Sequence, residues 1–135
     1  MEQCINFILT KAQQAVHQVF KAELVPYGVT PGQYGVLMCL WDENGQTVRQ
    51  LADRLSLDGS TMTGLLDRME QKGLIEKKPD PKDRRALQVL LTDNANELRE
   101  SLPLAIDAAN KKVLAEMNEN QVQAFKKLLW NLCKN

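Results

Sequence analysis

The sequence has few of the residues from which most catalytic and metal sites are built. Its 135 residues include one histidine, His17, and three cysteines, Cys4, Cys39 and Cys133, which lie far apart and form no CxxC pair. A zinc site needs several such ligands, usually in close pairs. There is also no G-x-S-x-G motif and no phosphate-binding glycine loop. We therefore expect no bound metal, no cofactor and no enzymatic activity.

Long apolar runs are missing as well. No stretch of about 18 apolar residues occurs, and the N-terminus has neither the basic nor the continuous apolar region of a signal peptide. The proportions of hydrophobic residues, 44%, and charged residues, 25%, are ordinary for a folded chain. We expect one domain that stays in the cytoplasm and binds no membrane.

Net charge is also absent, because Lys plus Arg and Asp plus Glu both total 17. The distribution of charge is more informative than its total. Residues 47–92 hold nine basic and seven acidic side chains, whereas residues 1–46 hold two and four, and residues 93–135 hold six and six. The excess in the middle third is small, so the positions of its cations decide what they can bind.

Apolar residues recur at intervals of three and four over much of the chain, which is the spacing of one helix face. Caps and breakers divide this pattern into six predicted helices, with a strand pair after the fourth. The helices run from Ile5 to just before Pro26, from Pro31 to the Asn44-Gly45 stop, from Val48 to Leu55, from Gly59 to Lys72, from Asp93 onward with a bend near Pro103, and from about Asn118 onward. The chain is therefore expected to be mainly α-helical.

Two short helices in the middle of the chain are separated by a tight turn. Thr47 and Gln50 fit a capping box at the start of the first of them. The turn is Ser56-Leu57-Asp58, in which Asp58 can cap the second helix, and Gly73 can close that helix at its C-terminal end. This arrangement predicts a helix-turn-helix.

The pattern changes from helical to alternating after Gly73. A short strand from Ile75 to Lys78, a turn at Pro79-Asp80-Pro81 and a second strand ending at Leu91 predict a β-hairpin. Its tip carries the sequence Lys82-Asp83-Arg84-Arg85. A cationic hairpin directly after a helix-turn-helix has the geometry of a wing that lies along the phosphate backbone or in the minor groove.

The helix from Gly59 to Lys72 has two distinct faces. One stripe, expected to pack on the domain, consists of Met62, Leu65, Leu66 and Met69. The other face consists of Ser60, Thr61, Thr63, Gly64, Asp67 and Arg68. Small hydroxyl side chains near a helix N-terminus let the backbone approach base edges in a major groove. A solvated face with capping hydroxyls would look similar, but together with the basic hairpin the pattern favours duplex DNA.

The segment from about Val29 to Thr92 resembles the MarR family of transcriptional regulators. The resemblance rests on Thr30-Pro31-Gly32-Gln33-Tyr34, on Leu51-Ala52-Asp53-Arg54-Leu55, on the stretch from Ser60 to Ile75, and on the wing pattern D-x-R-x-x-x-V-x-L-T at Asp83, Arg85, Val89, Leu91 and Thr92. It implies a single domain, with a winged helix-turn-helix at 30–92 flanked by dimerisation helices at 1–29 and 93–135. It also implies a homodimer that binds pseudo-palindromic operators as a repressor.

The resemblance and the residue types together assign roles at the DNA. We expect major-groove contacts from Ser60, Thr61, Thr63, Gly64 and Arg68, minor-groove contacts from Arg84 and Arg85, and phosphate contacts from Lys72, Lys77, Lys78 and Lys82. Asp67 would be repelled by phosphates, so we expect an orienting ion pair with Arg68 or Arg85, the alternative being acceptance of a hydrogen bond from cytosine N4. Asp83 is expected to pair with Arg85.

Proteins of this family often release DNA when a small phenolic or carboxylate ligand enters a cleft beside the dimer helices. The candidate pocket residues are His17, Phe20, Tyr27, Tyr34, Met38, Trp41 and Arg54, although ordinary core packing explains most of them equally well. A second alternative is a thiol-based redox sensor that uses Cys4, with Cys133 as a partner across a dimer, while Cys39 is expected to be an inert core residue. A third is a winged helix used only for protein association.

Overall fold

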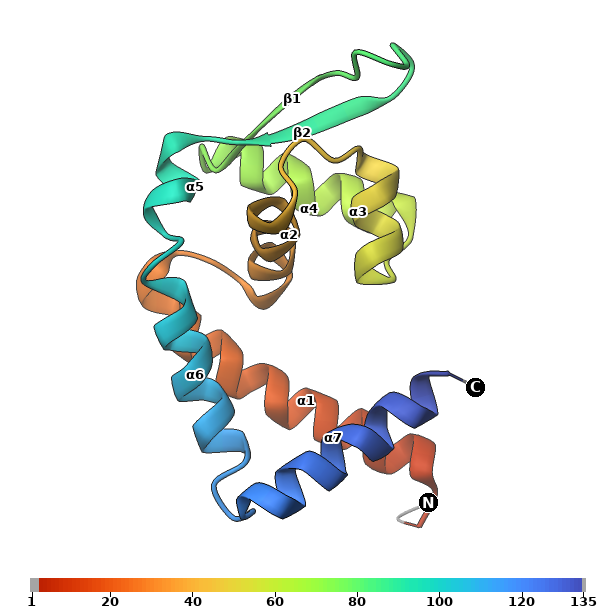
Figure 1. Cartoon of the computed structure of the whole chain (residues 1–135), viewed down its shortest axis with the longest axis vertical. Coiled ribbons are helices and arrows are strands. Elements are labelled where there is room, and N and C mark those ends of the chain that lie inside the picture. The colour runs from red at the N-terminus through yellow and green to blue at the C-terminus, as the bar shows by residue number, and fades with distance from the viewer. Residues whose placement is uncertain (1–2, 135) are drawn as a thin grey trace.

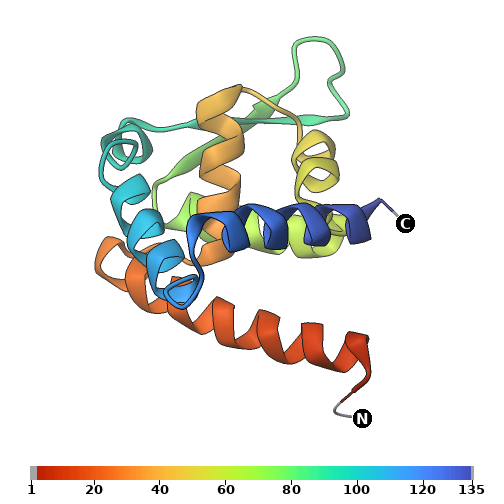
Figure 2. The ribbon, with the colours of Figure 1, turned by 60° about the horizontal axis from the view of Figure 1, so that its bottom comes forward.

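The computed structural model describes residues 3–134 and divides them between a winged helix-turn-helix and a set of long helices (Figure 1). The elements are α1 (Ile5–Leu24), the short 3-10 helix η1 (Val25–Tyr27), α2 (Pro31–Asp42), α3 (Val48–Leu55), α4 (Gly59–Gln71), β1 (Ile75–Pro79), β2 (Leu87–Leu91), α5 (Asp93–Glu97), α6 (Leu102–Val113) and α7 (Glu119–Cys133). The mainly helical fold with one antiparallel hairpin agrees with the sequence prediction. Figure 2 shows α1 and α7 extending from the rest of the chain as two arms.

Side-chain caps start the two helices of the helix-turn-helix. Thr47 and Gln50 form the predicted capping box at α3, since each side chain bonds the backbone N–H of the other. Asp58 caps α4 by accepting from the Thr61 N–H at 2.7 Å. Ser56 ends α3 with a left-handed φ of 54°, which turns the chain sharply into α4.

The wing consists of β1, β2 and the loop of residues 80–86, and its base is fixed by the segment between α2 and α3. Ile75 pairs with Leu91 and Pro79 with Leu87 in the hairpin. The Gly45 N–H donates to the Val89 carbonyl at 3.1 Å, while the Val89 N–H donates to the Gln46 carbonyl at 2.8 Å. The wing is therefore held by backbone hydrogen bonds to the segment that leads into α3.

The hydrophobic core lies between α2, α3, α4 and the wing. The predicted stripe of α4 is buried as expected, with Met62, Leu66 and Met69 fully inaccessible and Leu65 nearly so. These side chains pack with Leu37, Leu40, Leu51 and Val89, among others. Burial of this stripe leaves the opposite face of α4 in solvent.

The sequence prediction for the segment after the wing is wrong in one respect. A single bent helix was expected, but the chain forms the short α5 and a separate α6, with a break at residues 98–101. Pro103 lies in the first turn of α6, where its missing N–H is tolerated. In a continuous helix that N–H would have bonded the Arg99 carbonyl, and the proline ring would have clashed there.

Replacing Leu66 by alanine tests the importance of the buried stripe. Leu66→Ala should lower the free energy of unfolding by about 2–5 kcal/mol, because the side chain is fully buried and leaves a cavity. Thr63→Ala on the exposed face of the same helix should change it by less than about 0.5 kcal/mol. Urea unfolding at one fixed protein concentration provides the measurement, and equal losses in both variants would contradict this packing.

Candidate nucleic-acid interface

The reading face, defined as Ser60, Thr61, Thr63, Gly64 and Arg68, lies on the solvent side of α4. Asp58 organises its N-terminal end, because the Ser60 hydroxyl donates to it at 2.9 Å and the Thr61 hydroxyl at 2.9 Å. The Thr61 N–H and these two hydroxyls lower the pKa of Asp58. The hydroxyl protons are thus held by Asp58, which leaves the oxygen lone pairs of Ser60 and Thr61 free to accept.

The middle of the reading face has no side chain projecting from the helix at Gly64. A Cβ on Gly64 would lie 3.6 Å from Nη1 of Arg68, which is an ordinary contact, so the position does not require glycine for internal packing. Arg68 thus extends over the Gly64 backbone, and no ion pair to it is found among residues 3–134. The face presents hydroxyls, bare backbone and one guanidinium group.

The tip of the wing presents exposed cations. Asp80 and Asp83 shape it by accepting from the N–H groups of Lys82 and Arg85, each at 3.0 Å. Nε of Arg85 lies 3.6 Å from Oδ1 of Asp83, in the pairing that the sequence suggests, yet the Arg85 side chain is 94% exposed. Arg84 is also exposed. These cations can therefore reach a partner beyond the protein surface.

The sequence prediction for the ion-pair partner of Asp67 is wrong. Its carboxylate pairs with Lys77 on β1 and not with Arg68 or Arg85. Arg68 is the next residue on the helix, and adjacent helical side chains point in different directions. The Lys77 side chain is only 14% exposed and also lies 3.9 Å from Glu70. Lys77 is therefore neutralised within the protein, contrary to the phosphate contact expected from the sequence.

Lys72 is likewise bonded within the protein, whereas the sequence suggested a phosphate contact. Its ammonium donates to the Gly28 carbonyl at 2.8 Å and to Oε1 of Gln33 at 2.9 Å. Lys72 follows the last turn of α4, at the end remote from Ser60. Lys78 differs from Lys72 and Lys77, since its ion-pair partner is the equally exposed Glu76 at 3.8 Å.

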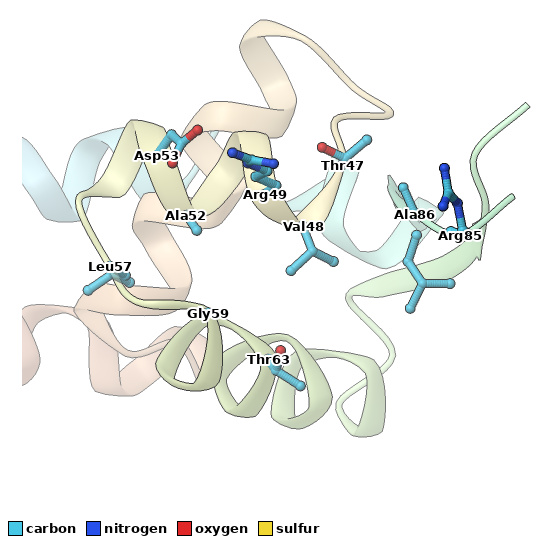
Figure 3. A pocket seen from close by; sticks show the side chains of 11 residues that line it. Thr47, Val48, Arg49, Ala52, Asp53, Leu57, Gly59, Thr63, Arg85 and Ala86 are labelled. Carbon is cyan, nitrogen blue, oxygen red and sulfur yellow. The ribbon is translucent and has the colours of Figure 1, made fainter. Parts of the chain in front are cut away.

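A hollow of 530 Å³ lies between α3, α4 and the wing (Figure 3). Arg49 from α3, Thr63 from α4 and Arg85 from the wing surround it. The sequence analysis missed Arg49, although the apolar positions Leu51 and Ala52 of α3 place it on the outer side of that helix. Among the described residues, Arg49 forms no ion pair within 4.0 Å. It is a free cation beside the reading face.

The candidate pocket residues divide into two groups. Tyr34, Met38, Trp41 and Arg54 line one cavity of 660 Å³, together with Asp42 and Arg99, which the sequence did not suggest.

The other three residues of the expected pocket do not line this cavity. His17 is exposed on α1, because it lies off the face that packs on α6. Tyr27 packs against the core. Phe20 lines a separate apolar groove of 320 Å³ between α1, α6 and α7.

The cysteines have different surroundings, and none lies in a metal-binding cluster. Cys39 is buried, and burial raises the pKa of its thiol. Cys4 is exposed at the start of α1, where the N–H groups of Phe7 and Asn6 lower the pKa of its thiol. Cys133 is exposed near the end of α7. Residues 3–134 contain no group of three or more His, Cys, Asp or Glu side chains able to hold a metal, and no helix there is long and apolar enough to cross a membrane.

The winged helix-turn-helix and the flanking helices have clear relatives. The family model described as MarR family matches residues 29–87. The organic hydroperoxide resistance transcriptional regulator of Bacillus subtilis is 29% identical over 133 residues, covering 98% of this chain and 88% of that protein. The HTH-type transcriptional regulator MgrA of Staphylococcus aureus is 30% identical over 130 residues, covering 96% and 87%.

Solved structures agree with these relatives. A probable transcriptional regulator from Pseudomonas aeruginosa superposes with a TM-score of 0.92 at 28% identity, covering 97% of this chain and 98% of that one. CouR from Rhodococcus jostii RHA1 bound to p-coumaroyl-CoA gives 0.80 at 27%, covering 97% and 92%. A mutant MarR from E. coli complexed with operator DNA gives 0.89 at 23%, covering 95% and 92%, and supports the fold. The chain therefore belongs to the MarR family and is a DNA-binding transcriptional regulator.

Proposed function

We propose that the chain is a homodimeric repressor that binds pseudo-palindromic operators, with α4 in the major groove and the wing at the adjacent minor groove. The observation that carries this proposal is the hollow shared by Arg49, Thr63 and Arg85, since it places α3, the reading face and the wing around one concave surface. A dimer seated on a promoter blocks polymerase by occupancy alone. Repression thus needs no surface beyond the DNA interface.

The phosphate contacts come from the cations that have no strong internal partner. These are Arg49, Lys78, Lys82, Arg84 and Arg85, and within residues 3–134 only Lys78 and Arg85 have a carboxylate oxygen within 4.0 Å, each in an exposed pair. Exposed ion pairs contribute little free energy, so phosphates can replace those carboxylates. The strand that runs between the major and minor grooves would pass over the hollow, where Arg49 and Arg85 face it from opposite sides.

Base contacts come from the reading face. The free lone pairs of Ser60 and Thr61 suit the exocyclic amino groups of adenine and cytosine, while Arg68 suits guanine O6 and N7. Thr63 lines the hollow one turn further along the helix. Because Asp58 fixes the two hydroxyls, their acceptor directions are set before DNA binds.

A second copy of the chain is the proposed occupant of the surface around α7. Within the described residues, none of the 15 residues of α7 is buried, although Val122, Phe125 and Leu129 form an apolar stripe. Phe125 and Leu129 line the groove against α1 and α6, and Leu128 and Trp130 are 64% and 70% exposed. An apolar helix face of this kind is stable in water when a partner covers it. Two-fold pairing would also present two reading faces to successive turns of the duplex.

The wing prediction can be tested with operator fragments selected from genomic DNA. Arg84→Ala and Arg85→Ala should each weaken binding and lower the slope of log affinity against log salt by about 0.9, because each removes one phosphate contact. Both variants should remain dimeric in size-exclusion chromatography. Unchanged affinity and slope in both would remove the wing from the interface, and absence of any selected fragment would contradict operator binding.

A small aromatic carboxylate is the proposed effector, and its site is the cavity lined by Tyr34, Trp41 and Arg54. Arg54 comes from α3 and pairs with Asp42 at 3.3 Å, while Arg99 from the break before α6 donates to the Trp41 carbonyl at 3.3 Å. Two guanidinium groups beside aromatic side chains suit a planar anion. The cavity lies between α3 and the segment that leads into α6. A ligand held by both arginines would therefore change the angle between α3 and α6 from that of the ligand-free protein. The p-coumaroyl-CoA complex of CouR supports an effector with an aromatic acyl group.

Ligand release can be tested with salicylate and its uncharged analogue salicylamide. Salicylate should release DNA at lower concentration than salicylamide, because only the acid can pair with Arg54 and Arg99. Arg99→Gln should reduce this difference, because only Arg54 remains to pair with the acid, and should keep ligand-free affinity, since Arg99 lies outside the DNA interface. Fluorescence anisotropy of a labelled operator measures both. Equal responses to the two compounds would rule out this site for carboxylates.

Thiol-based sensing is a second candidate function, favoured by the exposed Cys4 and its lowered thiol pKa. A lowered pKa gives more thiolate at neutral pH, and a hydroperoxide would oxidise this thiolate to a sulfenate while being reduced to its alcohol. Peroxide treatment should therefore release operator DNA from the wild type and from Cys133→Ser but not from Cys4→Ser. Identical release from all three proteins, or from none, would exclude this role for Cys4.

A further inference from the structure

Lys72 connects the end of α4 to a distant part of the chain. Its ammonium bonds the Gly28 carbonyl and Oε1 of Gln33, which are 44 and 39 residues away in sequence. Gly28 follows η1 directly after α1, with a left-handed φ of 68°. Gln33 lies in the first turn of α2. One side chain thus joins α4 to the junction between α1 and α2.

The two acceptors at this junction are themselves held firmly. Gln33 is only 1% exposed, and its Oε1 also accepts from the Thr30 N–H at 3.1 Å. Thr30 returns the interaction, since its hydroxyl oxygen accepts from the Gln33 N–H at 3.2 Å. This capping box fixes the amide of Gln33 against the start of α2. Lys72 is therefore anchored to a rigid point and not to a mobile loop.

The same geometry argues against a direct phosphate contact by Lys72. A lysine that turned to a phosphate would give up two good hydrogen bonds and leave the buried Oε1 of Gln33 with one donor fewer. At about 1.5 Å per residue, the length of α4 also separates Lys72 from the reading end near Ser60 by roughly 18 Å. The ammonium is well placed where it is, because helix C-terminal ends favour positive charge.

We propose that Lys72 is a positioning residue that fixes the direction of α4 relative to α1. The inference rests on the proposed function, in which α1 belongs to the dimer scaffold and two copies of α4 enter successive major grooves. An error in the direction of α4 would change the separation of the two reading faces. Lys72 therefore sets how strictly the dimer discriminates between operators whose half-sites are spaced differently.

The test compares Lys72→Met with Lys82→Met, which makes the same lysine-to-methionine substitution in the wing. Affinities are measured for the selected operator and for versions with one base pair added or removed between half-sites, over a range of salt. Lys72→Met should keep the wild-type salt slope but reduce discrimination between spacings at least threefold. Lys82→Met should lower the slope by about 0.9 and keep the discrimination, because it loses only a phosphate contact.

Unfolding in urea gives a second measurement that needs no DNA. Lys72→Met and Gln33→Met should each lower the unfolding midpoint, and the double variant should lower it by less than the sum, because both remove the same hydrogen bond. Additive shifts, an unchanged spacing preference, or a salt slope lowered by about one in Lys72→Met would each overturn the role of Lys72. Failure of the wild type to prefer any spaced operator would instead overturn the proposed function.

Discussion

Burial of one stripe of α4 is the constraint on which the DNA-binding surface depends. Met62, Leu66 and Met69 are fully inaccessible, and a helix that buries them can present only the opposite face to a ligand. The residues on that face are small or polar at the N-terminal end, where the helix dipole also favours an anionic partner. The reading face thus follows from core packing, because its residues are those that the buried stripe leaves outside.

Most acidic side chains around this surface have a partner in the protein, whereas Asp53, which also lines the hollow, forms no ion pair within 4.0 Å among the described residues. Asp58 accepts three hydrogen bonds at the start of α4, Asp67 pairs with Lys77, and Asp83 shapes the wing tip beside Arg85. A zero net charge of the whole chain is therefore compatible with a surface that carries several unpaired cations, among them Arg49 and Arg68. These carboxylates fix the hydroxyls of Ser60 and Thr61, the ammonium of Lys77 and the loop at the wing tip.

Local patterns were sufficient to predict most of the fold. The capping box at Thr47, the stripe of α4 and the hairpin all depend on residues close in sequence, and the structure agrees with each. One error is local, the break at residues 98–101, and the others concern contacts between segments separated in sequence. Nothing near Lys72 in sequence indicates that Gly28 lies beside it, and nothing near Lys77 indicates Asp67, so both lysines were assigned to phosphates. Arg49 was missed because its place beside the wing depends on the tertiary arrangement.

The internal pairing of Lys72 and Lys77 has a consequence for how the protein is distributed in a cell. Affinity for random DNA grows with the number of phosphates that a protein neutralises. The ammonium groups of Lys72 and Lys77 are bonded within the protein, so they add less to this affinity than free lysines would. The much larger number of unrelated sites on a chromosome therefore retains fewer copies. Fewer copies of the protein are then needed to keep the operator occupied, and the search for the operator is interrupted less often by non-specific binding.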